Sequence, residues 1–462
     1  MSLTVTHLTP TRYDLLAIMQ AALDAIDPYS AVRRVLHREG DILRVGDRPY
    51  DLTQFERVWV IGAGKAGAPM AQAVEAVIGE WLIGGLVVVK YAHLAPVKKV
   101  ELREAAHPVP DAAGLAAGAA ILEIAEQATE RDLILCLISG GGSALLEALS
   151  EPLTLENLQA TTAALLASGA TINEMNAVRK HLSRVKGGQL ARAATPAALV
   201  TLVLSDVVGS PLDVIASGPT VPDRSMWSQV NDIIGRYRLE KELPAVVTER
   251  IRRGVAGELP ETPKPGDPIF DRVEVVIVGD NIQAAEAAQQ EATARGYGST
   301  ILTTFLEGEA REVAKVAAAL GREVQAHDRP VAPPACLILG GETTVTLQPD
   351  HSPFPIPHSP FGKGGRNQEL ALAAAVALAG QAGITIGALA TDGTDGPTDS
   401  AGAVVDGSTM ERANKKGFDA MDHLARHDAY PLLDAVGDLL RSGPTNTNVN
   451  DLLFILVTAG EG

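Results

Sequence analysis

A glycine-rich stretch followed by polar residues is the part of the sequence best suited to bind phosphate. Residues 361–369 read FGKGGRNQE, and an alanine-rich helix is expected from Leu370 onward. Glycines leave backbone N–H groups uncovered, and a helix N-terminus attracts anions. We therefore predict an anion at this helix N-terminus, with Lys363 and Arg366 beside it. Turn formation by itself is the alternative explanation for the glycines of residues 361–369.

Two carboxylates follow a short way downstream. Asp392 and Asp395 lie in the segment ATDGTDG, residues 390–396, at the end of an apolar run over residues 384–390. Such acids suit a divalent cation or a proton acceptor next to phosphate. Either stretch alone is also explained by turn formation, but together they favour a site.

A third glycine-rich turn follows a predicted strand at residues 57–61. Residues 62–67 read GAGKAG and lead into a helix, which matches the G-x-G-x-x-G spacing of dinucleotide-binding turns. That fingerprint also needs a carboxylate after the second strand, where this chain has Lys90. Lys90 would suit NADP, so the dehydrogenase interpretation is weakened by this difference but stays open. Lys65, inside the turn, is expected to face phosphate or carboxylate, with a solvated lysine as the alternative.

A continuous apolar run at residues 133–138 predicts a strand buried on both faces. It leads into the turn SGGGS, residues 139–143, where backbone donors and two hydroxyls form a second candidate anion site. A binding role is favoured over a nucleophilic serine, because G-x-S-x-G is absent.

Polar residues at the ends of other predicted elements complete the candidates. Arg179 and Lys180 share a helix face with Asn176 and Ser183, which suits an acidic small substrate or a solvated surface. Asp206 follows the apolar strand 198–204, at the strand end where open α/β sheets bind ligands. Glu342 and Asn448 are placed similarly: Glu342 follows the predicted strand 336–339, and Asn448 precedes the predicted strand 452–457.

Composition limits the class of protein. The chain has 462 residues, of which 46% are hydrophobic and 21% charged, so we expect a globular protein of two or three domains. A net charge of −17 argues against nucleic acid and anionic membranes as partners. No apolar run reaches the roughly 18–20 residues of a membrane span. The two cysteines lie in apolar runs, which fits buried thiols, and a cytoplasmic location is predicted.

Proline density marks residues 255–270 as the expected linker. We therefore predict domains over residues 1–255 and 256–462, each built from alternating strands and helices. Residues 351–360, which contain His-Ser-Pro twice, read as a rigid loop or an insertion.

The sequence resembles the class II glycerate kinases, whose C-terminal part is the MOFRL domain. Eight motifs occur in the order of that family: GAGKA at 62–66, SGGGSA at 139–144, NAVRKHLS at 176–183, LSDV at 204–207, SGPT at 217–220, GGET at 340–343, GGRNQE at 364–369 and TDGTDG at 391–396. The resemblance covers nearly the whole chain, although residues 351–360 look longer than the family's usual connection. It implies an N-terminal Rossmann-like domain with a mostly parallel sheet and helices on both faces, a C-terminal α/β MOFRL-type domain, and an active site in the cleft between them.

The resemblance also implies an activity, namely ATP-dependent phosphorylation of D-glycerate on the 2-hydroxyl with Mg²⁺. Lys65 and Arg366 match the family's essential lysine and arginine. Asp206, Glu342, Asp392 and Asn448 match its acidic and amide site residues. The first three are also the expected Mg²⁺ ligands. The remaining predicted binding residues are Gly62, Gly64, Ser139, Gly140, Gly141, Gly142, Ser143, Arg179, Lys180, Thr343, Gly364, Gly365 and Asn367.

The roles expected from the residue types agree with this implication. Lys65 and Arg366 would stabilise the charge of a transferring phosphoryl group. Asp206 or Asp392 would accept the hydroxyl proton or hold Mg²⁺, with Glu342 assisting, and sequence alone does not apportion these roles. The 139–143 turn with Arg179 and Lys180 would hold the glycerate carboxylate or the ATP phosphates.

Two other functions stay open at this point. One is an NADP-dependent hydroxypyruvate reductase, and the other is a non-catalytic binding protein for acidic metabolites. A P-loop kinase is excluded, because G-x-x-x-x-G-K-[ST] does not occur. The oligomeric state is also left open, with a homodimer as one alternative.

Overall fold

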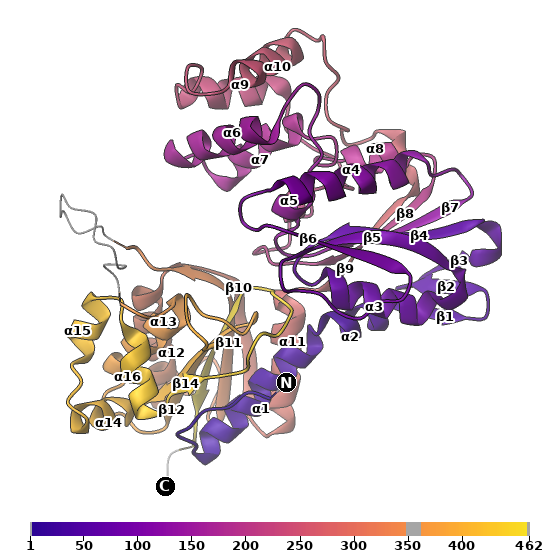
Figure 1. Ribbon diagram of the computed structural model, residues 1–462. Helices are drawn as coiled ribbons and strands as arrows, with labels where there is room; N and C mark the ends of the chain where they lie inside the picture. Colours follow the sequence, from indigo (N-terminus) through magenta and orange to yellow (C-terminus); the bar gives the residue numbers. More distant parts are fainter. Residues whose placement is uncertain (1, 348–361, 460–462) are drawn as a thin grey trace. The chain divides into compact units, whose positions relative to one another are not determined.

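A computed structural model describes residues 2–347 and 362–459 of the chain (Figure 1). They form two compact units. Residues 28–278 make up one, which we call the parallel-sheet unit. Residues up to 27 and from 279 onward make up the other, which we call the mixed-sheet unit.

The parallel-sheet unit is built on six strands. Their order is β6 (Val100–Ala105), β5 (Leu82–Lys90), β4 (Arg57–Ala63), β7 (Asp132–Ile138), β8 (Ala198–Leu204) and β9 (Val273–Gly279). The first five pair in parallel register. Strands β7 and β8 are buried along their whole length, because helices cover both faces. Helix α4 (Ala112–Glu126) packs on the face of Leu86 and Val88, and α3 (Gly67–Ile78) places Gly67 against Val87 on the other.

A helical layer with its own apolar core lies in the same unit. It contains α6 (Leu155–Ala167), α7 (Ile172–Leu182), α9 (Trp227–Arg236) and α10 (Ala245–Val255). Shorter elements complete the unit: α2 (Pro28–Val35), the antiparallel strands β1 (Leu36–Glu39), β2 (Ile42–Val45) and β3 (Arg48–Asp51), α5 (Gly142–Leu145) and α8 (Gln189–Ala194). The core of this layer fixes α7, which carries Arg179.

The mixed-sheet unit also has six strands. Their order is β10 (Gly298–Glu309), β11 (Ala335–Thr344), β15 (Asp451–Val457), β12 (Ile384–Ala390), β13 (Gly402–Asp406) and β14 (Leu439–Leu440). Only β10 and β11 run parallel to each other, and the other pairs are antiparallel. One core joins this sheet to α12 (Ala310–His327), α13 (Arg366–Ala377), α14 (Thr409–Lys415), α15 (Ala420–Ala425) and α16 (Ala429–Val436).

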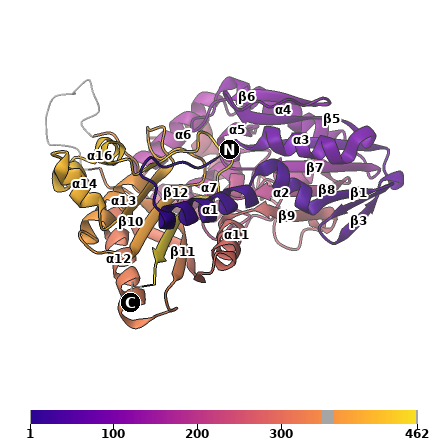
Figure 2. The same cartoon turned by 90° about the horizontal axis from the view of Figure 1, so that it is seen from below.

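The first helix of the chain belongs to the mixed-sheet unit. Helix α1 (Pro10–Ala25) lies beside α11 (Asn281–Ala294) in both views (Figures 1 and 2). A Cβ atom on Gly387 would lie 2.9 Å from Leu15 Cδ2, so α1 packs directly on β12. The buried Arg12 guanidinium forms ion pairs with Asp438 at 2.5 Å and Asp406 at 2.7 Å.

The units therefore differ from the predicted domains 1–255 and 256–462. Strand β9 falls within the predicted second domain, but it lies next to β8 in the first sheet. The expected linker is also tied to the parallel-sheet unit, since Trp227 Nε1 donates to Pro260 O (3.1 Å) and Thr262 Oγ1 donates to Asp223 (2.8 Å). Residues 351–361, with the predicted loop, lie outside the described residues. None of the described helices is long and apolar enough to cross a bilayer.

Candidate active site

The turn at residues 139–143 is joined to the first glycine-rich turn. Strands β4 and β7 are neighbours, so their carboxyl ends bring the two turns together. The Lys65 N–H donates to Gly140 O (2.9 Å), and the Ser139 side chain accepts from the Ala66 N–H (3.0 Å). A Cβ on Gly64 would overlap Ser139 Oγ. The glycines at 62 and 64 therefore permit close packing between the turns.

Three titratable side chains surround this turn. A Cβ on Gly141 would lie 3.5 Å from Lys65 Cγ and 2.9 Å from His107 Cδ2. One on Gly140 would overlap the Asp206 carboxylate. Burial, with a smaller contribution from the Lys65 charge, lowers the pKa of His107 to about 4, so its imidazole is neutral at pH 7. Lys65 and Asp206, which were predicted from separate motifs, lie along one turn.

Helix α7 contributes two further side chains to this turn. Arg179 Nη2 donates to Ser143 O at 3.0 Å. Ser143 Oγ lies 2.8 Å from Ser217 Oγ, which donates to Asn176 Oδ1 at 3.0 Å. Asn176 and Arg179 thus share the face of α7 that borders this turn, as their spacing predicts.

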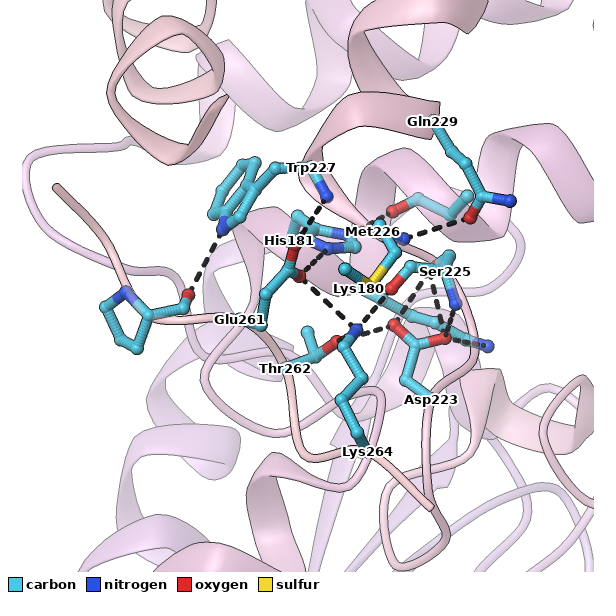
Figure 3. Close-up of polar contacts among 12 residues, drawn as sticks. Lys180, His181, Asp223, Ser225, Met226, Trp227, Gln229, Glu261, Thr262 and Lys264 are labelled. Carbon is cyan, nitrogen blue, oxygen red and sulfur yellow. Dashed lines mark hydrogen bonds and ion pairs between the residues drawn. The ribbon is translucent and has the colours of Figure 1, made fainter. Parts of the chain in front are cut away.

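Lys180 points elsewhere, into a buried polar network (Figure 3). Its Nζ lies 3.1 Å from Asp223 Oδ1, and both side chains are buried. Asp223 also accepts from Ser225 and Thr262, and His181 Nε2 lies 3.2 Å from Glu261 Oε2. Lys180 therefore holds α7 to residues 223–264. Neither the predicted substrate contact nor a solvated helix face describes its position.

In the mixed-sheet unit, the two stretches singled out first line one cavity of about 510 Å³. The glycine-rich stretch contributes Gly364, Gly365 and Arg366, and the downstream turn contributes Asp392 and Asp395. The other lining residues are Val345, Leu347, Gly362, Glu369, Thr394, Gly396, Pro397 and His427. The predicted meeting of these stretches is thus present within one unit.

The anion at the N-terminus of α13 is a carboxylate of the chain itself. Asp395 accepts from the backbone N–H groups of Asn367 (3.1 Å) and Gln368 (2.8 Å), and a Cβ on Gly365 would overlap it. The Lys363 ammonium lies 3.5 Å from the centre of the Tyr430 ring. The prediction of a free anion site here, with Lys363 beside it, is therefore wrong, because Asp395 already fills the helix N-terminus.

Arg366 is held by two carboxylates. Its Nε and Nη2 lie 2.5 and 3.1 Å from the two oxygens of Asp451, and its Nη1 lies 2.7 Å from Glu342 Oε1. Asp451 is buried, whereas the Glu342 side chain is 45% exposed. The sequence analysis did not single out Asp451. Its signal is an acidic residue at the start of the otherwise apolar strand β15.

Comparison with known proteins identifies the family. Residues 14–252 match a model described as a domain of unknown function (DUF4147), and residues 335–451 match the MOFRL family. The D-glycerate 2-kinase of Thermotoga maritima is 41% identical over 95% of this chain and 97% of its own length. A crystal structure of glycerate kinase from Thermotoga maritima superposes with a TM-score of 0.85, at 40% identity over 97% of this chain and all of that one. The chain belongs to the glycerate kinase family.

Another relative, which carries a different name, is as similar to this chain as the Thermotoga maritima kinase is. A protein of Agrobacterium vitis, provisionally named hydroxypyruvate reductase, is 42% identical over 96% of this chain and 94% of its own length. Sequence similarity therefore identifies the family. The choice between a kinase and a reductase reaction depends on the residues of the site.

Three of the predicted polar site residues, Asn448, Asp392 and Thr343, differ in their hydrogen bonds. Asn448 Oδ1 accepts from the Asn450 N–H (3.0 Å), and Asp392 Oδ1 accepts from the Thr394 N–H (3.0 Å). Both side chains thus stabilise their own turns. Thr343 Oγ1 is buried without a hydrogen-bond partner among the described residues, which leaves it available to a ligand.

The predicted Mg²⁺ ligands are divided between the units of this family member. Asp206 lies in the parallel-sheet unit, and Glu342 and Asp392 lie in the mixed-sheet unit. Within residues 2–347 and 362–459, no group of three His, Cys, Asp or Glu side chains is arranged to hold a metal. Mg²⁺ often takes only one or two carboxylates and completes its shell with water and substrate phosphates, so single carboxylates still fit.

Proposed function

We propose that this chain is an ATP-dependent glycerate 2-kinase, which phosphorylates D-glycerate on its 2-hydroxyl and uses Mg²⁺. The observation that carries the proposal is the placement of Lys65 and Asp206 around the 139–143 turn, in a chain whose relatives include a D-glycerate 2-kinase along nearly its whole length. A cation and a proton acceptor on one glycine turn are what transfer to a hydroxyl requires.

Each unit supplies one cation to the proposed reaction. Phosphoryl transfer needs positive charge around the oxygens of the moving group and an aligned hydroxyl. Lys65 would supply charge from the parallel-sheet unit, and Arg366 would supply it from the mixed-sheet unit. Arg366 is kept in place by Asp451, while the exposed Glu342 is the partner that phosphate would displace.

The carboxylates divide the remaining work. Asp206, against Gly140, would accept the proton of the 2-hydroxyl or bind Mg²⁺, and Asp392 would do the other of the two tasks. Mg²⁺ held by one of these carboxylates would neutralise charge on the phosphate groups. His107 is neutral and lies with Lys65 against Gly141, so it adds no charge that would compete with Lys65 for the phosphate.

The reductase is the second candidate, favoured by the G-x-G-x-x-G spacing and by the name of the Agrobacterium relative. Packing weakens it. A Cβ on Gly62 would overlap Leu137 O, and one on Gly64 would overlap Ser139 Oγ, so β7 and its turn already require both glycines. The turn therefore needs no pyrophosphate to explain its composition.

A direct assay separates these functions and the binding-protein alternative. Purified protein with D-glycerate, ATP and Mg²⁺ is expected to release ADP, and ³¹P and ¹³C NMR are expected to place the phosphate on carbon 2. With hydroxypyruvate and NADPH we expect no oxidation of the nucleotide. NADPH oxidation without ADP release would refute the kinase, and ligand binding without any turnover would favour the binding protein.

The setting of this reaction is a part of the proposal. ATP and glycerate are intracellular metabolites, so we propose a cytoplasmic enzyme that acts on a small molecule. Burial raises the pKa of both thiols, Cys136 and Cys336, to about 12, which makes them unreactive. A homodimer stays a prediction.

The rate is expected to fall as the pH drops through about 7. Burial, with a smaller contribution from Asp395, raises the pKa of Asp451 to about 7 against the opposing charge of Arg366. A protonated Asp451 is neutral and holds Arg366 less firmly, so activity needs the ionised form. We expect kcat/KM, measured from pH 5.5 to 9 at saturating Mg²⁺, to show this limb in the wild type and in Glu342→Gln. Asp451→Asn should be slower and lack it, and an unchanged limb would contradict the role of Asp451.

A further inference from the structure

Arg179 is a buried cation that lacks a counterion among the described residues. Arg179 is 9% exposed. Among the described residues, it makes a single hydrogen bond to protein, from its Nη2 to Ser143 O. Its Nε is buried without a partner. A guanidinium carries five N–H donors and is costly to bury unless an anion accompanies it. The site therefore has one positive charge in excess.

The Glu147 carboxylate, whose charge acts on Arg179, is already paired with another cation. Glu147 is fully buried and forms an ion pair with Lys186 at 2.9 Å. Ser183 Oγ donates to the other Glu147 oxygen at 2.6 Å. Glu147 and Lys186 thus neutralise each other, and Arg179 remains for a ligand.

Ser143, next to Arg179, presents a hydrogen-bond acceptor. Ser217 has one hydroxyl proton, which it donates to Asn176 Oδ1. The 2.8 Å contact between Ser217 Oγ and Ser143 Oγ must therefore use the proton of Ser143. This order leaves the Ser143 oxygen with free lone pairs, so it accepts a hydrogen bond from a ligand hydroxyl and donates none.

We propose that Arg179 and Ser143 form the subsite for the acid acceptor, in which Arg179 binds the carboxylate of glycerate and Ser143 Oγ accepts from its 3-hydroxyl. The proposal rests on the glycerate kinase function. A planar guanidinium matches a carboxylate with two parallel hydrogen bonds. One arginine beside a hydroxyl acceptor suits a small hydroxy acid better than a triphosphate. The Lys65 side chain lies against Gly141, which is two residues before Ser143 in the turn.

Calorimetric titration without nucleotide turnover tests the carboxylate contact. Arg179→Gln is expected to weaken D-glycerate binding by about 10- to 100-fold, because a hydrogen-bonded charge is lost. Binding of a non-hydrolysable ATP analogue with Mg²⁺ should change less than about twofold. The matched control is Arg184→Gln, since Arg184 is on the surface, paired with Glu126. Loss of nucleotide affinity with unchanged acid affinity would overturn the proposal.

Ser143→Ala gives a second test that does not depend on the folding of an Arg179 variant. Loss of one neutral hydrogen bond should weaken D-glycerate by about 3- to 10-fold. D-Lactate, which lacks the 3-hydroxyl, should bind wild type and Ser143→Ala equally. An equal loss of affinity for both acids would mean that Ser143 contacts a group other than the 3-hydroxyl, and this would overturn its assignment.

The outcome is separable from that of the kinase assay. If wild type phosphorylates D-glycerate while Arg179→Gln keeps wild-type affinity for it, only the subsite is refuted. If Arg179→Gln loses acid affinity but wild type transfers no phosphate, the subsite stands and the kinase function falls.

Discussion

Replacement of Arg366 by alanine is expected to lower kcat by about 10³- to 10⁵-fold, the range measured for arginines that stabilise a transferring phosphoryl group. The guanidinium is already oriented in the structure by both oxygens of Asp451. Alanine removes the charge and also leaves the Asp451 carboxylate buried without its ion-pair partner. The steady-state rate with saturating ATP and D-glycerate measures the effect.

Two further variants separate charge from geometry at this position. Arg366→Lys keeps the charge but cannot contact both Asp451 oxygens, so we expect only a small recovery of rate. Glu342→Gln removes the exposed partner of Arg366, and its free energy of unfolding should stay within about 1 kcal/mol of wild type, since exposed pairs contribute little to stability. Arg366→Ala with normal kcat and a raised KM for one substrate would mean uniform binding instead of transition-state stabilisation.

The stability of Arg366→Ala must be measured beside its rate. Without Arg366, burial keeps the Asp451 carboxyl group in its neutral form, and a buried polar group that has lost its hydrogen-bond partner costs about 1–3 kcal/mol of unfolding free energy. Urea unfolding at pH 7 should therefore show a lower midpoint with an unchanged slope. A protein that is folded at the assay temperature and still lacks turnover assigns the loss to chemistry.

Lys65→Ala is expected to lower kcat by about 10²- to 10³-fold, because one preorganised positive charge is removed from the transition state. The substitution leaves the turn intact. Lys65 joins the turns through its backbone N–H, which donates to Gly140 O and is kept in alanine. Only the aliphatic stem against Gly141 and the ammonium are lost.

Lys363→Ala is the matched control for Lys65→Ala. Both variants delete one lysine next to a glycine-rich stretch, but the Lys363 ammonium lies on the Tyr430 ring, so its rate should be close to wild type. Single-turnover mixing of enzyme, labelled ATP and D-glycerate would show whether the chemical step is affected. Equal rates for both lysine variants would remove Lys65 from the reaction.

Local patterns predicted the strands because these strands are buried on both faces. The run at 133–138 is apolar at every position, the run at 198–204 is apolar except for Thr201, and both became interior strands of the parallel sheet. Strand β9 follows the expected linker along the chain, yet it joins the sheet of the first unit. An apolar run specifies burial and leaves open which neighbour provides it.

Domain membership depended on contacts between distant parts of the chain. Helix α1 has an ordinary helical pattern, and its place is decided by Gly387 on β12 and by ion pairs from Arg12 to Asp406 and Asp438, about 400 residues away. Proline density at 255–270 indicated a linker, yet hydrogen bonds to Asp223 and Trp227 keep that segment within the first unit.

The sequence by itself determined which residue types can do chemistry and where turns must be. Glycine at 140 and 141, Lys65, Asp206 and Arg366 were all identifiable, because anion binding and tight turns permit few residue types. Only the tertiary structure decided the partner of each charge. Asp395 fills the helix N-terminus, Asp223 takes Lys180, Asp451 holds Arg366, and Arg179 is left without a counterion among the described residues. The physical reason is that an ion pair forms only between groups that packing brings together. A lysine or arginine has a structural role where packing places a carboxylate of the chain beside it, and it is left to bind substrate where packing places none.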